Sequence, residues 1–154
     1  MPKFGKRSSL CLDTCHDDLQ KIHREAIKDI PVDYGIHEGK RSDEKQLEYF
    51  EAGKSRIDPR IPELKQKGKH LREPSEATDF HVAEVWNGKS LAWDDTHLAF
   101  IAGYLIRTAQ ELFARGEISH LLRWGGDWDS DGIIALDHSL KDMPHLELYQ
   151  PPTA

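Results

Sequence analysis

The sequence has little cysteine, no long apolar run and no surplus of positive charge, and each shortage excludes a class of protein. Its two cysteines, Cys11 and Cys15, are too few for a disulfide-rich scaffold, and their spacing is not the C-x-x-C of redox and zinc motifs. No apolar stretch approaches the roughly 20 residues of a membrane span, and no signal peptide is recognisable. The net charge of −6 argues against a nucleic-acid binder, because phosphate contacts need clustered lysine and arginine.

What remains is the composition of one globular domain. Hydrophobic residues make up 38% of the chain and charged residues 31%, which provides enough apolar material for one core. There is no internal repeat, low-complexity tract or interdomain linker. We therefore expect residues 1–154 to form a single domain, with residues 1–15 as a loosely ordered lead-in.

Apolar periodicity predicts about three helices and several short strands. Helix signals run from Asp13 or Thr14 to Pro31, from Ser42 to Gly53, and from Asp94 to Gly116. Strands are expected over residues 32–37, 121–124, 133–136 and 144–148. Residues 54–78 are rich in proline and charge and read as a long loop, which in a compact domain is usually functional. Helices first, then strands joined by short turns, indicate an α+β fold with a small antiparallel sheet.

Nine histidines are present, and two segments combine histidine with acidic residues, Lys69–His81 and Lys141–Leu148. Two imidazoles and one carboxylate can hold a zinc ion and leave a fourth position open for water. A further carboxylate three residues before one histidine can take the proton of that water. The two segments lie far apart in the sequence, so this pattern alone does not single out a metal site.

Longer motifs in the chain are more specific. Residues 123–128 read Arg-Trp-Gly-Gly-Asp-Trp and residues 142–148 read Asp-Met-Pro-His-Leu-Glu-Leu. Residues 31–41 lead into a Gly-Lys-Arg-Ser motif at residues 39–42, and residues 46–55 end in Gly-Lys-Ser. In this order the segments resemble the metallopeptidases that include phage L-alanyl-D-glutamate endopeptidases and the D-Ala-D-Ala carboxypeptidases and dipeptidases. The similarity covers most of the chain and implies a D-Ala-D-Ala peptidase/hedgehog-like fold.

The resemblance also assigns roles to individual residues. It implies that His70, Asp79 and His145 hold Zn²⁺. It implies that Asp142 is the general base and then the acid that protonates the leaving amine. Arg41 would bind the scissile carbonyl or a substrate carboxylate, whereas without the resemblance we would read it as a surface ion pair.

One feature departs from the family pattern. The first histidine and the aspartate are seven positions apart in the family, but His70 and Asp79 are nine apart, and Gly68 replaces the family's serine. Either a two-residue insertion bulges outward and leaves both ligands in place, or Asp79 is not a ligand. In the second case Glu76 and His81 are the alternatives.

A second cation site is a further hypothesis. Asp127, Asp129 and Asp131 alternate and are followed by Gly132, which fits the first half of a Ca²⁺-binding loop. The twelfth position is His138 in place of the usual glutamate, although Asp137 is adjacent. The competing interpretation is an acidic turn without an ion.

The resemblance implies a zinc-dependent peptidoglycan peptidase that cleaves the L-Ala–D-Glu bond of the stem peptide, as a phage lysis enzyme. One alternative is a D-Ala-D-Ala carboxypeptidase, and another is a non-catalytic, metal-containing wall-binding or virion module. A nuclease built on the aspartate cluster is disfavoured by the acidic balance.

The expected partner is peptidoglycan, bound by a monomer that has no separate wall-binding domain, does not bind nucleic acid and does not insert into a membrane. Without a signal peptide, the protein is expected in the host cytoplasm until lysis and then in the periplasm at the cell wall. It would depend on a separate membrane-pore protein for access.

Overall fold

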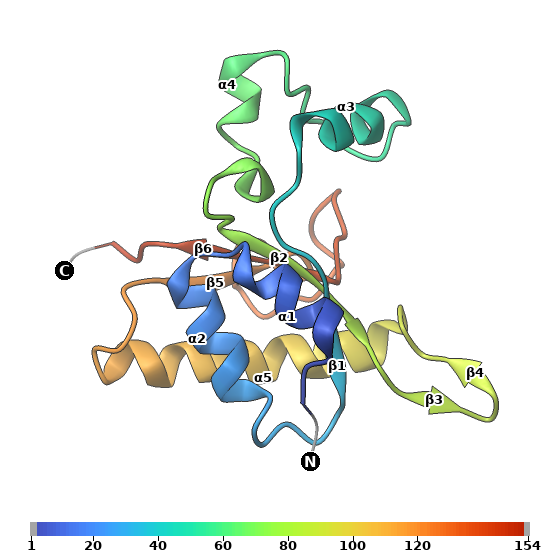
Figure 1. The fold of residues 1–154 in the computed structure, drawn as a ribbon, viewed down its shortest axis with the longest axis vertical. Helices are drawn as coiled ribbons and strands as arrows, with labels where there is room; N and C mark the ends of the chain where they lie inside the picture. Colours follow the sequence, from blue (N-terminus) through green and yellow to red (C-terminus); the bar gives the residue numbers. More distant parts are fainter. Residues whose placement is uncertain (1–2, 153–154) are drawn as a thin grey trace.

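A four-stranded antiparallel sheet is the frame on which the rest of the chain is arranged, in a computed structural model that describes residues 3–152 (Figure 1). The strands are β1 (Tyr34–Glu38), β2 (Ala77–Val82), β5 (Leu121–Trp124) and β6 (His145–Tyr149), in the spatial order β1-β2-β6-β5. The central strands β2 and β6 come from parts of the chain more than sixty residues apart. The sheet therefore brings the two histidine-containing segments side by side.

Five α-helices accompany the sheet within residues 3–152, rather than about three: α1 (Lys6–Asp13), α2 (Asp17–Ala26), α3 (Asp43–Glu51), α4 (Pro62–Lys65) and α5 (Asp95–Ala114). The three predicted helices correspond to α2, α3 and α5. The caps of α3 and α5 are the expected ones, since Ser42 accepts from the Lys45 amide at 3.1 Å and Asp94 from the His97 amide at 3.1 Å. The short α4 and a 3₁₀ turn at Lys69–Leu71 lie within the predicted loop.

The expectation of a loosely ordered lead-in is wrong for residues 6–15. Helix α1 packs against β1. Leu12 within the helix and Cys15, which follows it, are both buried in the core. A Cβ atom on Gly39 would lie 2.6 Å from the carbonyl oxygen of Cys11, so the chain after β1 rests directly on the end of α1. A helix of eight residues has too few apolar positions for a visible periodicity, and tertiary packing supplies its stability.

The strand expected over residues 133–136 is also wrong. Its backbone groups are satisfied by turn contacts instead of a ladder: the Ile133 amide donates to the Asp131 carboxylate at 2.8 Å, and the Ala135 amide donates to the Gly126 carbonyl at 2.8 Å. Alternating apolar residues predict a strand only where a partner strand is within reach.

Two short strands, β3 (Val85–Trp86) and β4 (Lys89–Ser90), form a small separate hairpin that projects beyond the sheet (Figure 1).

The two faces of the sheet differ in character because side chains alternate along each strand. One face is apolar and packs against the core that α2 and α5 complete, with Phe80, Val82, Leu122, Leu146 and Leu148 buried in it. The other face carries the polar residues of the same strands: Asp79, His81, Arg123, His145 and Glu147. In Figure 1 the segment with α3 and α4 rises on the far side of the sheet from α5, so the polar face opens toward that segment.

The turn after β5 shapes the polar face. The Gly125 amide donates to the His145 carbonyl at 2.9 Å, and the Asp142 amide donates to the Gly125 carbonyl at 3.0 Å. The indole Nε1 of Trp124 donates to the Met143 carbonyl at 2.7 Å. A Cβ on Gly125 would lie 2.1 Å from the Asp142 carbonyl oxygen, so only glycine allows the segment before β6 to pack this closely.

We therefore predict that Gly125→Ala destabilises the protein by roughly 1–3 kcal/mol, because the added methyl group must displace backbone. Gly103→Ala is the matched control, since Gly103 is exposed in α5 and a Cβ there meets nothing within 4 Å. That change should stabilise the protein by about 0.5–1 kcal/mol through helix propensity. Urea unfolding of both variants measures the difference, and equal stabilities would contradict the packing argument.

Candidate metal centre

His70, Asp79 and His145 converge on the polar face of the sheet, each from a different element. One ligand atom from each lies within 4.8 Å of the other two. Nε2 of His70 is 3.1 Å from Oδ1 of Asp79, and Nδ1 of His145 is 3.2 Å from the same oxygen. Asp79 on β2 stands directly opposite His145 on β6, so the pairing of two strands creates this contact.

The nine-residue spacing between His70 and Asp79 does not keep them apart, since the His70 ring on the 3₁₀ turn and the Asp79 carboxylate on β2 still come within 3.1 Å. The alternative ligands have other neighbours. Glu76 forms an ion pair with Arg72 at 3.1 Å, and the His81 ring lies 6.2 Å from the His37 ring and 6.3 Å from the Trp93 ring.

Both histidines are held by a second contact on the far side of the ring. Nδ1 of His70 donates to the Gly39 carbonyl at 2.7 Å, and Nε2 of His145 donates to Glu147 at 2.9 Å. Each ring is thereby oriented with its other nitrogen toward Asp79. Metal-binding histidines are held in this way, with one nitrogen on the ion and the other on a carbonyl or carboxylate. The residues present therefore fit a metal ion.

The electrostatics of the centre favour a positive charge between these groups. Burial lowers the pKa of His145, but hydrogen bonds to Asp79 and Glu147 outweigh it and raise the pKa to about 10. Burial raises the pKa of Asp79, but the charges and hydrogen bonds of His70 and His145 hold it well below its usual range. A site that retains protons so strongly offers a surplus of negative charge to a cation that replaces them.

Asp142 lies in the same cleft, on the segment that precedes β6. Burial raises its pKa above the usual aspartate value, and the nearby Asp79 adds to the increase, although His145 opposes it. A general base works best when its pKa lies near the working pH, so the direction of the shift suits proton transfer.

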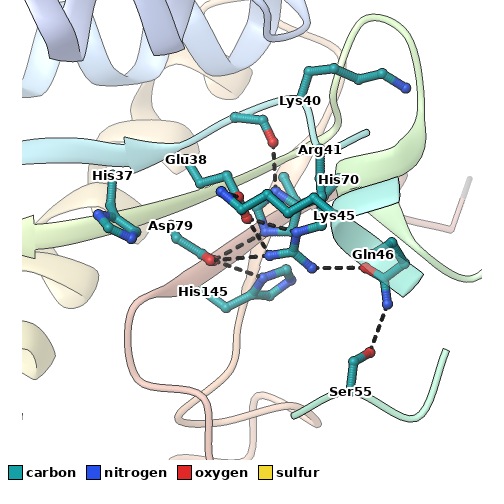
Figure 2. A network of polar contacts seen from close by, with 12 residues as sticks. His37, Glu38, Lys40, Arg41, Lys45, Gln46, Ser55, His70, Asp79 and His145 are labelled. Carbon is teal, nitrogen blue, oxygen red and sulfur yellow. Dashed lines mark hydrogen bonds and ion pairs between the residues drawn. The ribbon is translucent and has the colours of Figure 1, made fainter. Parts of the chain in front are cut away.

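Arg41 lies within a polar network that joins Glu38, Gln46 and Asp79, as Figure 2 shows. Its Nε donates to Glu38 at 2.8 Å and its Nη1 to Gln46 at 2.9 Å, while Nη2 is 3.6 Å from Oδ2 of Asp79. The guanidinium also stacks over the Tyr49 ring at 4.7 Å from its centroid. Arg41 is therefore a fixed cation beside the candidate metal centre rather than a surface ion pair.

A cleft of about 610 Å³ opens onto the centre. Its lining includes Gly53 and residues 54–57 and 67–69 of the segment predicted as a long loop, together with Trp128, Leu140 and Asp142. Trp128 lies against His145 with the ring centroids 5.5 Å apart.

The sequence prediction did not include Glu38, Gln46 or Glu147 as site residues. The i, i+2 spacing of His145 and Glu147 on one strand face was the available signal for the last of these.

The carboxylates of the predicted calcium site also lie close together. Carboxylate oxygens of Asp127, Asp129 and Asp131 lie within 4.8 Å of one another in the turn that follows β5. Asp131 also interacts with Asp137, whose pKa is raised by their shared hydrogen bond.

Comparison with known proteins identifies the family. A sequence profile of the phage L-alanyl-D-glutamate peptidases matches residues 1–149. The chain belongs to this family. The L-alanyl-D-glutamate peptidase of Escherichia phage T5 is 33% identical over 149 residues, which cover 95% of this chain and 97% of that protein. The crystal structure of the Serratia marcescens L-Ala D-Glu endopeptidase ChiX matches with a TM-score of 0.69 and 27% identity, covering 96% of this chain and 90% of that one. The resemblance read from the motifs and the α+β fold class are confirmed.

We predict that Glu147→Gln weakens metal binding roughly 10- to 100-fold, because the His145 ring loses the carboxylate that orients it and raises its basicity. Glu111→Gln is the matched control, since Glu111 is exposed on α5 and pairs with Arg107. Competition with a chromogenic chelator gives the affinities. Equal affinities for the two variants would show that Glu147 has no such role.

Proposed function

We propose that this protein is a zinc-dependent peptidase that hydrolyses the L-Ala–D-Glu bond of peptidoglycan stem peptides. The observation that supports it most is the placement of His70, Asp79 and His145 at the end of a cleft that also contains Asp142 and Arg41. Membership of the phage L-alanyl-D-glutamate peptidase family supports the choice of bond.

The donor set supports zinc as the metal. Two imidazole nitrogens and one carboxylate oxygen form a catalytic zinc set that leaves a coordination position open. Zinc in such a site lowers the pKa of a bound water to about 7 and polarises a carbonyl group.

The remaining chemistry belongs to the chain's own residues. Asp142 takes the proton of the attacking water as its oxygen bonds to the alanyl carbonyl carbon. The same carboxyl group then delivers that proton to the glutamyl nitrogen as the C–N bond breaks. Arg41, held by Glu38 and Gln46, donates hydrogen bonds where negative charge develops on the carbonyl oxygen. The products are an alanyl carboxylate and a glutamyl amine.

We further propose that the protein acts as a monomeric phage lysis enzyme. Similarity to a phage T5 enzyme supports this role. On this proposal it stays in the host cytoplasm until lysis, and a separate membrane-pore protein gives it access to the periplasm and the wall. Within residues 3–152, no helix has the length and apolarity to cross a membrane.

Hydrolysis of isolated peptidoglycan tests the proposed activity. Asp142→Asn should lower kcat roughly 10²- to 10⁴-fold while metal binding persists, because only proton transfer is removed. His145→Ala should lose both metal and activity. Asp13→Asn, which alters an exposed ion pair with Arg24, is the control and should behave as wild type.

The products separate the proposal from its alternatives. New alanyl carboxyl and glutamyl amino termini, identified by mass and abolished by a zinc chelator, are the expected result. Release of free D-Ala would instead indicate a D-Ala-D-Ala carboxypeptidase. Intact peptidoglycan in the presence of metal-loaded protein would indicate a non-catalytic wall-binding or virion module.

The acidic turn supports a second proposal, a Ca²⁺ site formed by Asp127, Asp129 and Asp131. Alternating carboxylates followed by a glycine suit oxygen coordination of calcium. Gly132 has a φ of +87°, which allows its amide to turn inward and donate to Asp127 at 3.0 Å. Asp137 places a fourth carboxylate beside Asp131. It precedes the twelfth position of the loop, where the usual calcium loop has a glutamate and this chain has His138.

Calcium should therefore stabilise the zinc-loaded protein, by about 2.7 kcal/mol at a calcium concentration 100 times its Kd. A combined Asp129→Asn/Asp131→Asn variant should lose this gain, because it removes two of the anionic ligands. Thermal melting with zinc retained and calcium added or chelated measures the effect. A melting temperature that is independent of calcium in the wild type would rule the site out.

A further inference from the structure

The cleft also has a basic wall, a set of cationic side chains among its lining residues that the hydrolysis itself does not use. Besides Arg41, it is lined by four basic residues, Lys54, Arg56, Lys67 and Lys69. Lys69 is 3.7 Å from Glu76. Within residues 3–152, by contrast, Lys54, Arg56 and Lys67 have no ion-pair partner, and their side chains are exposed to the cleft. A chain with a net charge of −6 thus concentrates unpaired positive charge beside its candidate active site.

The backbone holds this basic wall in a defined place. Gly53 ends α3 with a φ of +75°, and the Lys54 amide donates to the Tyr49 carbonyl at 2.8 Å. Lys54 thereby returns toward α3, where its Nζ lies 6.0 Å from the centroid of the Tyr49 ring. The same ring carries the Arg41 guanidinium at 4.7 Å. One aromatic side chain therefore gathers a basic wall residue and the arginine of the candidate active site.

A chain of hydrogen bonds ties the wall to the site directly. Gln46 accepts from Arg41 and donates to the Ser55 hydroxyl at 2.9 Å, as Figure 2 shows. The Ser55 hydroxyl also accepts from the Ile57 amide at 3.2 Å. Lys54 and Arg56 flank Ser55 in sequence, so their backbone is positioned relative to Arg41 even though their side chains are free to reach a ligand.

The chemistry of the scissile bond indicates what such a wall binds. Alanine on one side of the bond has no ionisable side chain. Glutamate on the other side has two carboxyl groups, and when one continues the chain the other remains a free carboxylate. Lysine and arginine are the donors that bind carboxylates most strongly.

We infer that Lys54, Arg56 and Lys67 form a carboxylate-binding subsite for the glutamyl side of the substrate. This inference rests on the proposed peptidase function and adds a specificity to it. The subsite selects stem peptides whose glutamyl carboxylate is free over those in which it is a carboxamide. It also orients the peptide, because the basic wall binds the glutamyl carboxylate whereas the alanyl side has no ionisable side chain.

Two synthetic peptides test this specificity, both with an L-Ala–D-Glu bond, one with the free glutamyl carboxylate and the other with the corresponding carboxamide. The wild type should cleave the carboxylate with a kcat/KM about 10-fold or more higher, with the difference mainly in KM and reduced at high salt. The combined variant Lys54→Gln/Arg56→Gln/Lys67→Gln should bring the ratio close to one. It should lower cleavage of the carboxylate peptide far more than cleavage of the carboxamide peptide.

A charge-matched variant distinguishes binding by a local subsite from an effect of the protein's overall electrostatic field. Lys28→Gln/Arg107→Gln/Arg115→Gln removes the same number of positive charges from exposed positions outside the cleft and should retain the wild-type ratio. Thermal melting of both triple variants monitors folding, which exposed substitutions should leave unchanged.

The outcomes distinguish failure of the inference from failure of the proposed function. Equal cleavage of both peptides by the wild type, or equal loss for both peptides in the cleft variant, would overturn the subsite while leaving the peptidase intact. Cleavage of neither peptide by the zinc-loaded wild type would overturn the proposed function, and the subsite with it.

Discussion

The antiparallel pairing of β2 with β6 is the constraint on which the site depends. Asp79 is opposite His145 in this register, and Ala77 is opposite Glu147. Because side chains alternate along a strand, a slip of one residue would turn Asp79 into the core and bring Phe80 to the polar face. The large apolar side chains on the core face therefore protect the register, and through it the convergence of the metal-binding groups.

The segment from Gly39 to Arg41 is the second support of the site, and it depends on the N-terminal helix. Gly39 accepts from His70 and packs against the end of α1, while the Arg41 amide donates to the His70 carbonyl at 2.9 Å. The ring and the carbonyl group of His70 are thus both held by backbone groups of this one segment. The short helix α1 therefore helps to fix one of the three candidate ligands, through the segment that packs on its end.

Charge is divided within the cleft in a way that matches the proposed reaction. Asp79, Asp142 and Glu147 surround the candidate metal centre, where a cation and a mobile proton are needed. Lys54, Arg56 and Lys67 line the same cleft, where they could meet an anionic substrate group. Arg41 stands between the two regions, neutralised in part by Glu38, whose pKa is lowered by Arg41 and Lys45 against the effect of burial. On the proposed function, this division would let an acidic protein bind an acidic peptide.

Local patterns were reliable where one element has a strong signal of its own. The long apolar stripe of α5, the serine cap of α3 and the positive φ of Gly53 all follow from residues adjacent in sequence. They were unreliable where structure depends on a distant partner. Helix α1 is ordered by β1, and residues 133–136 form no strand because their amide groups bond to the turn that precedes them.

The sequence by itself determined the fold class, the family and the identity of the residues that could carry the chemistry, because motifs such as Arg-Trp-Gly-Gly-Asp-Trp are contiguous. Only the tertiary structure decided whether His70 and Asp79 meet across their longer loop, and that Glu147 and Glu38 complete the surroundings of His145 and Arg41. It also decided that Lys54, Arg56 and Lys67 line the same cleft. The physical reason is that distances between separate segments are set by strand register and packing, which no local spacing encodes.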